Sequence, residues 1–421
     1  MNKFVSFLAC LIASYITFNM IALYGATHNM QKYEEYRMKY AKPISEWEKP
    51  NVISGIMYEE MQPLPQIAPD TPKNPYTTEK MLLGKQLFNE PKLSKSGQIA
   101  CASCHNKELG FGDGLKTSFG HDRQRGKRNA PNIMMSGFFH DLFWDGRANS
   151  LESQALMPIS NPIEMAQEIP YMQDSIAKMP IYYPLFILSF GNAAQKDELL
   201  KLYLRADMID KKDMYDRILT ELVRADMQEK PLDSILQSRK LSKQQIELAK
   251  KLITPENIAK AIATYERSLV PKNTRFNRFL QGEYNALSNK EIYGLHIFRT
   301  KGGCMNCHYG VALSDGAFHN IGLSFYGRKL QDLGRYEITK ETKDLGAFKT
   351  PSLIAISKSS PYMHNGIFPT LKGVINMYNA GFPTPKLKIS DKPTPTTTPL
   401  IKPLHLSEEE MEALEAFLYA L

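Results

Sequence analysis

Cys101-Ala102-Ser103-Cys104-His105 and Cys304-Met305-Asn306-Cys307-His308 are two copies of the pattern Cys-x-x-Cys-His, and they contain four of the five cysteines of the chain. In c-type cytochromes the two thiols of such a motif bond covalently to a haem, and the adjacent histidine becomes an axial ligand of the iron. Zinc sites and disulfides also use cysteine pairs, but neither explains a histidine directly after each pair. The motifs therefore predict two covalent haems. The expected attachment residues are Cys101, Cys104, Cys304 and Cys307, and the expected iron ligands are His105 and His308.

The residues around the two motifs repeat as well. Leu83-Gly84-x-x-Leu87-Phe88 precedes the first motif, and Tyr293-Gly294-x-x-Ile297-Phe298 precedes the second. After the motifs, a proline, a glycine and a leucine have the same spacing between Pro131 and Leu151 as between Pro351 and Leu371. A fixed internal repeat indicates a duplicated structural unit. We therefore expect two cytochrome c-like domains.

Length and composition agree with this expectation. The 421 residues can hold two domains of ordinary size with linkers, and a hydrophobic content of 43% is typical of a globular protein. The net charge of +8 is the small difference between 52 basic and 44 acidic residues. Such a thin positive charge permits docking to an acidic redox protein, but it does not predict nucleic-acid binding.

Helix signals dominate the chain. Thr254-Pro255-Glu256 has the pattern of a helix start, and Ser288 with Glu291 forms a capping box ahead of another apolar run. Residues 407–421 have the pattern of a closing amphipathic helix, whereas residues 386–403 form a Pro/Thr-rich loop. No sustained alternation of a strand is visible. The predicted fold is mainly α, with two tandem cytochrome c-like haem domains and loop-rich connections.

The N-terminus predicts export. A mostly apolar run at residues 4–25 is about long enough to cross a bilayer as one helix. Residues 22–26 offer no convincing cleavage site, so we favour an uncleaved inner-membrane anchor over a cleaved signal peptide. Cys10 in this run is interpreted as a buried thiol. In both cases the expected location is the periplasm, where covalent attachment of haem takes place.

Several motifs together resemble one known family. They are Arg128-Asn129-Ala130-Pro131, Phe143-Trp144-Asp145-Gly146-Arg147 and Glu164-Met165 in the first half, and Pro361-Tyr362-Met363-His364-Asn365-Gly366 in the second. This combination is similar to bacterial di-haem cytochrome c peroxidases, a family that includes the MauG-type enzymes. The resemblance covers residues 77–421. It implies that the first haem reacts with peroxide and that the second receives electrons.

The resemblance also implies roles for single residues. Glu164 matches the acid–base carboxylate, and Gln154 matches the amide that orients peroxide. His121 matches the distal histidine that blocks the first iron at rest in many members. Trp144 matches the tryptophan that carries electrons between the haems. Without the resemblance, the tryptophan would be read as core packing, the histidine as a loop residue, and the other two as solvated helix residues.

The sixth ligand of the second haem has two candidates. The family position falls on Tyr378, as in MauG-type enzymes, and Met377 lies one residue earlier. Neighbouring residues of a helix point about 100° apart, so only one of them can face the iron. We prefer Tyr378, with Met377 as the alternative. If both side chains merely pack, another ligand such as Met363 would be needed.

A calcium ion between the domains is a further implication of the resemblance. Asn129 matches its side-chain ligand. The backbone carbonyls of Ser359 and Pro361 lie where the family supplies two more oxygen ligands. Calcium binds such hard oxygen ligands readily.

The expected organisation has five parts. Residues 1–27 are the anchor or signal segment, 28–76 a tether, 77–195 the peroxidatic cytochrome c domain, 196–252 a helical insertion and 253–421 the electron-transfer cytochrome c domain. The insertion is longer than the resemblance predicts, and a surface elaboration is its expected meaning.

Three functions fit these features. The first is a peroxidase that reduces hydrogen peroxide with electrons from a reduced c-type cytochrome or a quinol-linked donor. The second is a MauG-like enzyme that oxidises side chains of a partner protein, and the third is a di-haem electron carrier. Glu164, Gln154 and Trp144 argue against the carrier, whereas Tyr378 and His121 point in opposite directions between the other two. We predict a cytochrome-c peroxidase, and a homodimer is compatible with this prediction.

Overall fold

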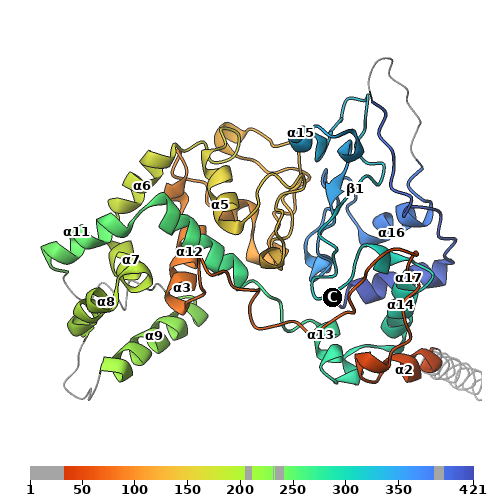
Figure 1. Ribbon diagram of the computed structural model, residues 1–421, viewed down its shortest axis with the longest axis horizontal. Coiled ribbons are helices and arrows are strands. Elements are labelled where there is room, and N and C mark those ends of the chain that lie inside the picture. Colours follow the sequence, from red (N-terminus) through yellow and green to blue (C-terminus); the bar gives the residue numbers. More distant parts are fainter. Residues whose placement is uncertain (1–32, 204–210, 231, 233–240, 384–392) are drawn as a thin grey trace, which may run out of the picture.

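The computed structural model describes residues 33–203, 211–230, 232, 241–383 and 393–421. These residues form two lobes that are joined by two connecting segments (Figure 1). The expected anchor at residues 1–27, with Cys10, lies outside the described residues. Among the described helices, none is both long and apolar enough to cross a membrane.

The first lobe surrounds the first Cys-x-x-Cys-His motif. At Gly84 an added Cβ would lie 1.9 Å from the backbone oxygen of Ala261, so only glycine allows the two helices that carry these residues to approach so closely. Leu83, Ile258 and Ile262 are buried in the core beside this crossing. The helices of this lobe are α3 (Thr78–Phe88), α4 (Cys101–Cys104), α5 (Leu151–Ser160), α6 (Ile169–Ala177), α7 (Tyr183–Phe190), α8 (Ala193–Leu200), α9 (Lys211–Met227), α11 (Lys243–Leu252) and α12 (Pro255–Arg267).

The second lobe repeats the same crossing. An added Cβ at Gly294 would lie 1.9 Å from the backbone oxygen of Ala413. The short strands β1 (Phe318–His319) and β2 (Phe348–Lys349) pair antiparallel. The helices of this lobe are α2 (Glu34–Tyr40), α13 (Arg275–Leu280), α14 (Asn289–Arg299), α15 (Tyr336–Thr339), α16 (Leu371–Asn379) and α17 (Glu408–Leu418). Helices α3 and α12 of the first lobe therefore correspond to α14 and α17 of the second, and the prediction of a mainly α fold with two related lobes is confirmed.

The packing divides the chain differently from the expected boundaries. Helix α12 follows the expected boundary at residue 253, but its apolar stripe packs against α3 of the first lobe. The described part of the expected tether, residues 33–76, also packs. Tyr40, Trp47 and Met61 from this stretch are buried in the core of the second lobe. The apolar side chains of both segments therefore place α12 with the first lobe and most of the supposed tether with the second.

Local signals for helix ends agree with the structure. The Thr254 side chain accepts a hydrogen bond from the backbone of Asn257 at the start of α12, and Ser288 with Glu291 forms the expected capping box of α14. Ser407 caps α17. The described part of the expected insertion at residues 196–252 is mostly helical, and Ile218 of α9 is buried in the core of the first lobe. Part of the Pro/Thr-rich loop, residues 386–392, lies outside the described residues.

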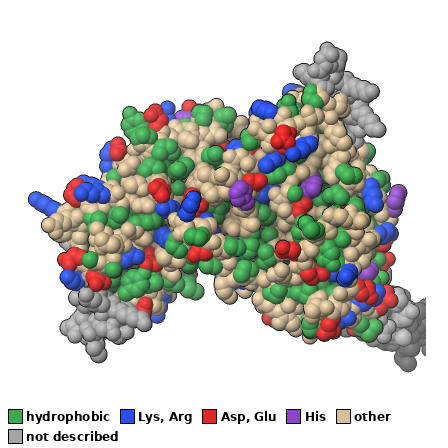
Figure 2. Space-filling view, viewed as in Figure 1, with side chains coloured by type: hydrophobic (Ala, Val, Ile, Leu, Met, Phe, Trp, Pro, Cys, Tyr) green, Lys and Arg blue, Asp and Glu red, His purple; other side chains and the backbone are tan. Residues whose placement is uncertain are grey.

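Charged side chains are mixed on the surface. On the face drawn in Figure 2, acidic and basic side chains lie among one another and do not separate into large areas of one sign. This distribution agrees with the small net charge of +8 in 421 residues. Long-range attraction of a strongly charged polymer such as nucleic acid therefore has no basis on this face.

Candidate active site

A cavity of about 630 Å³ lies at the first Cys-x-x-Cys-His motif. Its walls include Cys101, Cys104 and His105, together with Phe88 of α3 and Ile262 of α12. The volume falls within the range of roughly 300–1,000 Å³ that is typical of ligand and cofactor sites. The glycine-mediated crossing of α3 and α12 therefore brings the haem motif against a space of the right size.

Both motif histidines are oriented for a metal. Nδ1 of His105 lies 2.9 Å from the backbone oxygen of Phe111, and Nδ1 of His308 lies 2.9 Å from that of Leu313. A histidine that donates from Nδ1 to a carbonyl keeps the lone pair of Nε2 for a metal. Burial lowers the pKa of both imidazoles, which favours the neutral form that binds iron. The four motif cysteines form no disulfide, so they also fit a thioether-bound haem in each lobe.

Glu164 and Gln154 line the cavity of the first lobe. Gln154 lies on α5, and Glu164 lies in the loop that follows this helix. Asn161 Nδ2 donates a hydrogen bond of 2.9 Å to Glu164 Oε1. Burial raises the pKa of Glu164, whereas the charge of Arg147 and the hydrogen bond from Asn161 lower it. A carboxyl group with a raised pKa can both take up and release a proton nearer neutral pH, as acid–base catalysis requires.

His121 lies beside the Glu164 loop. Its backbone N–H donates to the backbone oxygen of Glu164 at 2.8 Å, and an added Cβ at Gly120 would lie 2.0 Å from the oxygen of Ile163. The His121 ring is not among the side chains that line the cavity. Its Nδ1 is buried and has no hydrogen-bond partner among the described residues. Its bond to the first iron therefore stays a prediction.

Trp144 lies where the two lobes meet. Its Nε1 donates to the backbone oxygen of Asn129 at 2.9 Å, and its own backbone oxygen accepts from Lys349 N of β2 at 2.9 Å. The indole ring meets His364 of the second lobe edge-on, with ring centroids 6.4 Å apart. The His364 ring stacks on Phe348 at 3.5 Å. This position at the junction agrees with the predicted electron relay, which itself stays a prediction.

Tyr378 and Met377 take different faces of α16. Leu371 and Ile375 are buried, and Tyr378 follows them by seven and three residues, so it shares their face. Burial raises the pKa of Tyr378, and the neighbouring thiols of Cys304 and Cys307 raise it further. Met377 points about 100° away from this face. The arrangement therefore favours Tyr378 over Met377 as the ligand of the second haem.

The structure connects the expected calcium ligands only through a backbone hydrogen bond between their two segments. Asn129 is buried, and its Nδ2 donates to the backbone oxygen of Leu115 at 2.8 Å. Ser359 and Pro361 lie in the loop that leads to His364, whose backbone oxygen accepts from Asn129 N at 2.8 Å. A calcium ion at Asn129, Ser359 and Pro361 stays a prediction.

Three basic residues near Trp144 were missed by the sequence analysis. Lys349 lines the cavity from the second lobe, and its Nζ lies 3.3 Å from the centroid of the Phe139 ring. Burial lowers the pKa of Lys349 to about 7. Arg128 and Arg147 both bind Asp145. The two arginines stand inside the quoted motifs, but sequence alone could not name their partners, and two-residue strands such as β2 leave no periodic signal.

Comparisons with known proteins decide the family. A model of the di-haem cytochrome c peroxidase family matches residues 78–224 and 219–285. The methylamine utilization protein MauG of Methylorubrum extorquens is 31% identical over 359 residues, which cover 85% of this chain and 82% of that protein. The chain belongs to the di-haem cytochrome c peroxidase family. A cytochrome c551 peroxidase of this family, from Nitrosomonas europaea, is 32% identical over 76% of this chain and 78% of its own length.

A solved structure supports the same assignment. The crystal structure of a MauG-like protein associated with microbial copper homeostasis matches with a TM-score of 0.63 and 27% identity, over 85% of this chain and 94% of that one. Membership confirms the predicted family, the two haem c cofactors and the class of enzyme, a peroxidase-type oxidoreductase.

Arg147→Gln should move the acidic limb of the pH–rate profile of this peroxidase to higher pH. The charge of Arg147 lowers the pKa of Glu164, so its removal raises this pKa further. As the pH falls, the carboxylate that accepts the proton is then lost at a higher pH. The measurement is kcat/KM for peroxide as a function of pH, with Arg147→Lys as the charge-conserving control. An unmoved limb in the glutamine variant would show that this arginine does not tune the carboxyl group.

Proposed function

We propose that this chain reduces hydrogen peroxide to water in the cavity of the first lobe, with electrons that enter at the second haem. The overall reaction combines one peroxide molecule, two electrons and two protons into two molecules of water. The electrons are supplied by a reduced c-type cytochrome or a similar donor. Bound haem supplies an iron that binds peroxide and exchanges electrons with it.

The side chains of this chain supply the remaining functions. Glu164 accepts a proton from one oxygen of the peroxide and delivers a proton to the other oxygen, which leaves as water. The amide of Gln154 holds peroxide by hydrogen bonds in the orientation that this proton transfer needs. Trp144 passes electrons from the second lobe to the first. His121, if it binds the resting iron, must move away before peroxide can enter.

One observation carries this proposal. Glu164, Gln154 and Trp144 line the same cavity as Cys101 and His105, although they come from separate loops and helices. An electron carrier needs no acid–base carboxyl group beside its haem. Burial raises the pKa of Glu164, and carboxyl groups with shifted pKa values are concentrated at functional sites. The arrangement therefore favours an enzyme over a carrier.

Titration of the fully reduced protein tests the proposal. Each chain stores two electrons, one per haem, so one molecule of hydrogen peroxide should oxidise both haems under anaerobic conditions. The absorbance of both reduced haems should fall together and reach its end point at one equivalent of peroxide per chain. Consumption of many equivalents with no matching loss of reduced haem would indicate catalase-like disproportionation instead.

A MauG-like activity is the second candidate, and Tyr378 is the observation that favours it. This tyrosine shares the buried face of α16 and lies near the thiols of Cys304 and Cys307, whereas Met377 does not share that face. A tyrosinate ligand stabilises oxidised iron, whereas a methionine thioether raises the haem potential. Oxidation of side chains on a partner protein needs a second haem that is readily held in its oxidised states.

Tyr378→Phe should therefore change the absorption spectrum of the second haem and raise its midpoint potential. The shift is expected on the order of 100 mV or more, since axial ligands tune haem potentials over about 0.8 V. Met377→Leu is the matched control and should leave both properties unchanged. Spectroelectrochemical titration gives both readouts. The reverse pattern would make Met377 the ligand and favour the ordinary peroxidase reaction.

We further propose where the enzyme works and what else it holds. Residues 1–27 direct it to the periplasm, as an uncleaved inner-membrane anchor or a cleaved signal, because haem is attached covalently outside the cytoplasm. Asn129 and the carbonyls of Ser359 and Pro361 hold a calcium ion between the lobes. A homodimer is the proposed assembly.

A further inference from the structure

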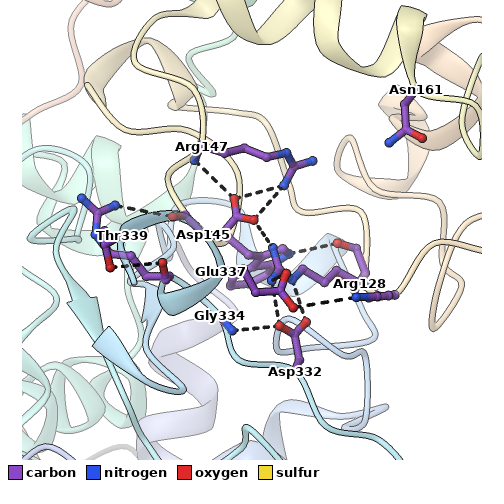
Figure 3. Close-up of polar contacts among 12 residues, drawn as sticks. Arg128, Asp145, Arg147, Asn161, Asp332, Gly334, Glu337 and Thr339 are labelled. Carbon is purple, nitrogen blue, oxygen red and sulfur yellow. Dashed lines mark hydrogen bonds and ion pairs between the residues drawn. The ribbon is translucent and has the colours of Figure 1, made fainter. Parts of the chain in front are cut away.

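Arg128 joins the loop that carries Trp144 to the second lobe. Its guanidinium donates two parallel hydrogen bonds of 2.7 Å to Asp332, from Nε to Oδ2 and from Nη2 to Oδ1. The remaining nitrogen, Nη1, donates to the carboxylate of Asp145, the residue that directly follows Trp144. Figure 3 shows the arginine between these two carboxylates. One side chain of the first lobe therefore connects the Trp144 loop to the other lobe.

The contacts of Arg128 are shielded from water. The side chains of Arg128, Asp145 and Asp332 are 13%, 4% and 7% exposed. Exposed ion pairs do little to fix the relative position of two segments, because water and salt screen them and their side chains move. A buried, bidentate pair between an arginine and a carboxylate instead fixes both distance and orientation. Asp332 is itself held by Gly334, whose backbone N–H donates to Oδ1 at 2.9 Å.

Trp144 depends on the same cluster. Its indole Nε1 donates to the carbonyl of Asn129, the residue directly after Arg128. Asn129 N donates in turn to the carbonyl of His364, whose ring the indole meets edge-on. The pair of residues 128 and 129 therefore holds Trp144 through its ring nitrogen and through Asp145, and holds the second lobe through Asp332 and His364.

We infer that Arg128 is a positioning residue for electron transfer, which fixes Trp144 against His364 across the junction of the lobes. The inference rests on the proposed relay function of Trp144. Misplacement of a reacting group by about 1 Å can cost up to roughly a hundredfold in rate, and a relay between two lobes is exposed to any shift of one lobe against the other. Lysine keeps the charge of arginine but cannot form the two parallel bonds.

The test uses holoprotein variants on both sides of the junction. Arg128→Lys removes the bidentate pair, and Asp332→Asn weakens it while the bond between Arg128 and Asp145 remains. The matched control is Glu60→Gln, because Glu60 forms a two-pronged pair with Arg299 of α14 that lies within the second lobe. Reduced protein is mixed with peroxide in a stopped-flow instrument, and oxidation of the second haem is followed.

We expect oxidation of the second haem to slow at least tenfold in Arg128→Lys and Asp332→Asn, with unchanged spectra of both haems and an unchanged first phase at the first haem. The control should behave like the parent protein. In a Trp144→Phe background the same substitutions should add almost nothing, since residues that act through one another are not additive.

Three results would overturn the inference. The first is a normal rate in both variants, provided that Trp144→Phe alone is slow. The second is an effect that persists at full size in the Trp144→Phe background, because it would indicate general loosening of the fold. The third is an equal effect in the Glu60→Gln control. A normal rate in Trp144→Phe itself would instead count against the proposed relay, so the two failures are distinguishable.

Discussion

Glu164→Gln should slow the cleavage of bound peroxide by about a hundredfold or more, while both haems stay attached. The substitution keeps the size and polarity of the side chain but removes its ability to accept a proton, and general acid–base groups contribute about 10²–10⁴ in rate. Glu164 lines the cavity, and burial raises its pKa, which suits it to exchange a proton there. Single-turnover kinetics with reduced protein and excess peroxide measure this step directly.

Glu168→Gln is the matched control for this variant. Glu168 lies four residues farther along the same loop and is exposed to solvent, so its substitution should leave the rate unchanged. Haem content and absorption spectra of both variants should equal those of the parent. Near-normal cleavage in Glu164→Gln would show that Glu164 is not the acid–base group.

Trp144→Phe should uncouple the two haems. Phenylalanine preserves most of the bulk in the wall between the lobes, but it is much harder to oxidise and has no N–H to donate to Asn129. After mixing reduced protein with peroxide, the first haem should be oxidised promptly, whereas oxidation of the second should be at least tenfold slower than in the parent, because the residue positioned between the haems is lost. Stopped-flow spectra at wavelengths that separate the haems give both rates.

Trp47→Phe is a stringent control, because the chain contains only two tryptophans. Trp47 is buried in the second lobe, where its Nε1 donates to the backbone oxygens of Tyr40 and Lys42. Its replacement should lower the unfolding temperature without affecting the exchange between the haems. Equal slowing in both variants would indicate that loss of stability, and not loss of a relay, causes the effect.

The parts of this fold that sequence could predict depend on short-range patterns. The Cys-x-x-Cys-His motifs, the capping box at Ser288 and Glu291, and the repeated glycines Gly84 and Gly294 all act over a few residues, so their spacing carries the information. The repeat also predicted two related lobes. The repeat did not reveal that α12 packs in the first lobe. The apolar stripe of this helix could pack against a segment that precedes it in the chain or against one that follows it.

The parts that sequence missed depend on contacts between distant residues. Arg128 binds Asp332, 204 positions away, and no local pattern indicates such a partner. The stretch from residue 33 to 76 lacks helical periodicity over most of its length, so it resembled a tether although Tyr40 and Met61 are buried. The close packing of Gly120, next to His121, against the Glu164 loop likewise joins residues more than 40 positions apart.

Steady-state turnover with a reduced c-type cytochrome tests the central claim most directly. The purified di-haem protein is mixed with hydrogen peroxide and reduced cytochrome c, and the loss of both reactants is followed. If the chain is a cytochrome-c peroxidase, two molecules of cytochrome should be oxidised for each peroxide consumed, and Glu164→Gln should abolish most of this turnover. Absence of cytochrome oxidation above the rate without enzyme, with both haems intact and a range of donors tried, would contradict the account.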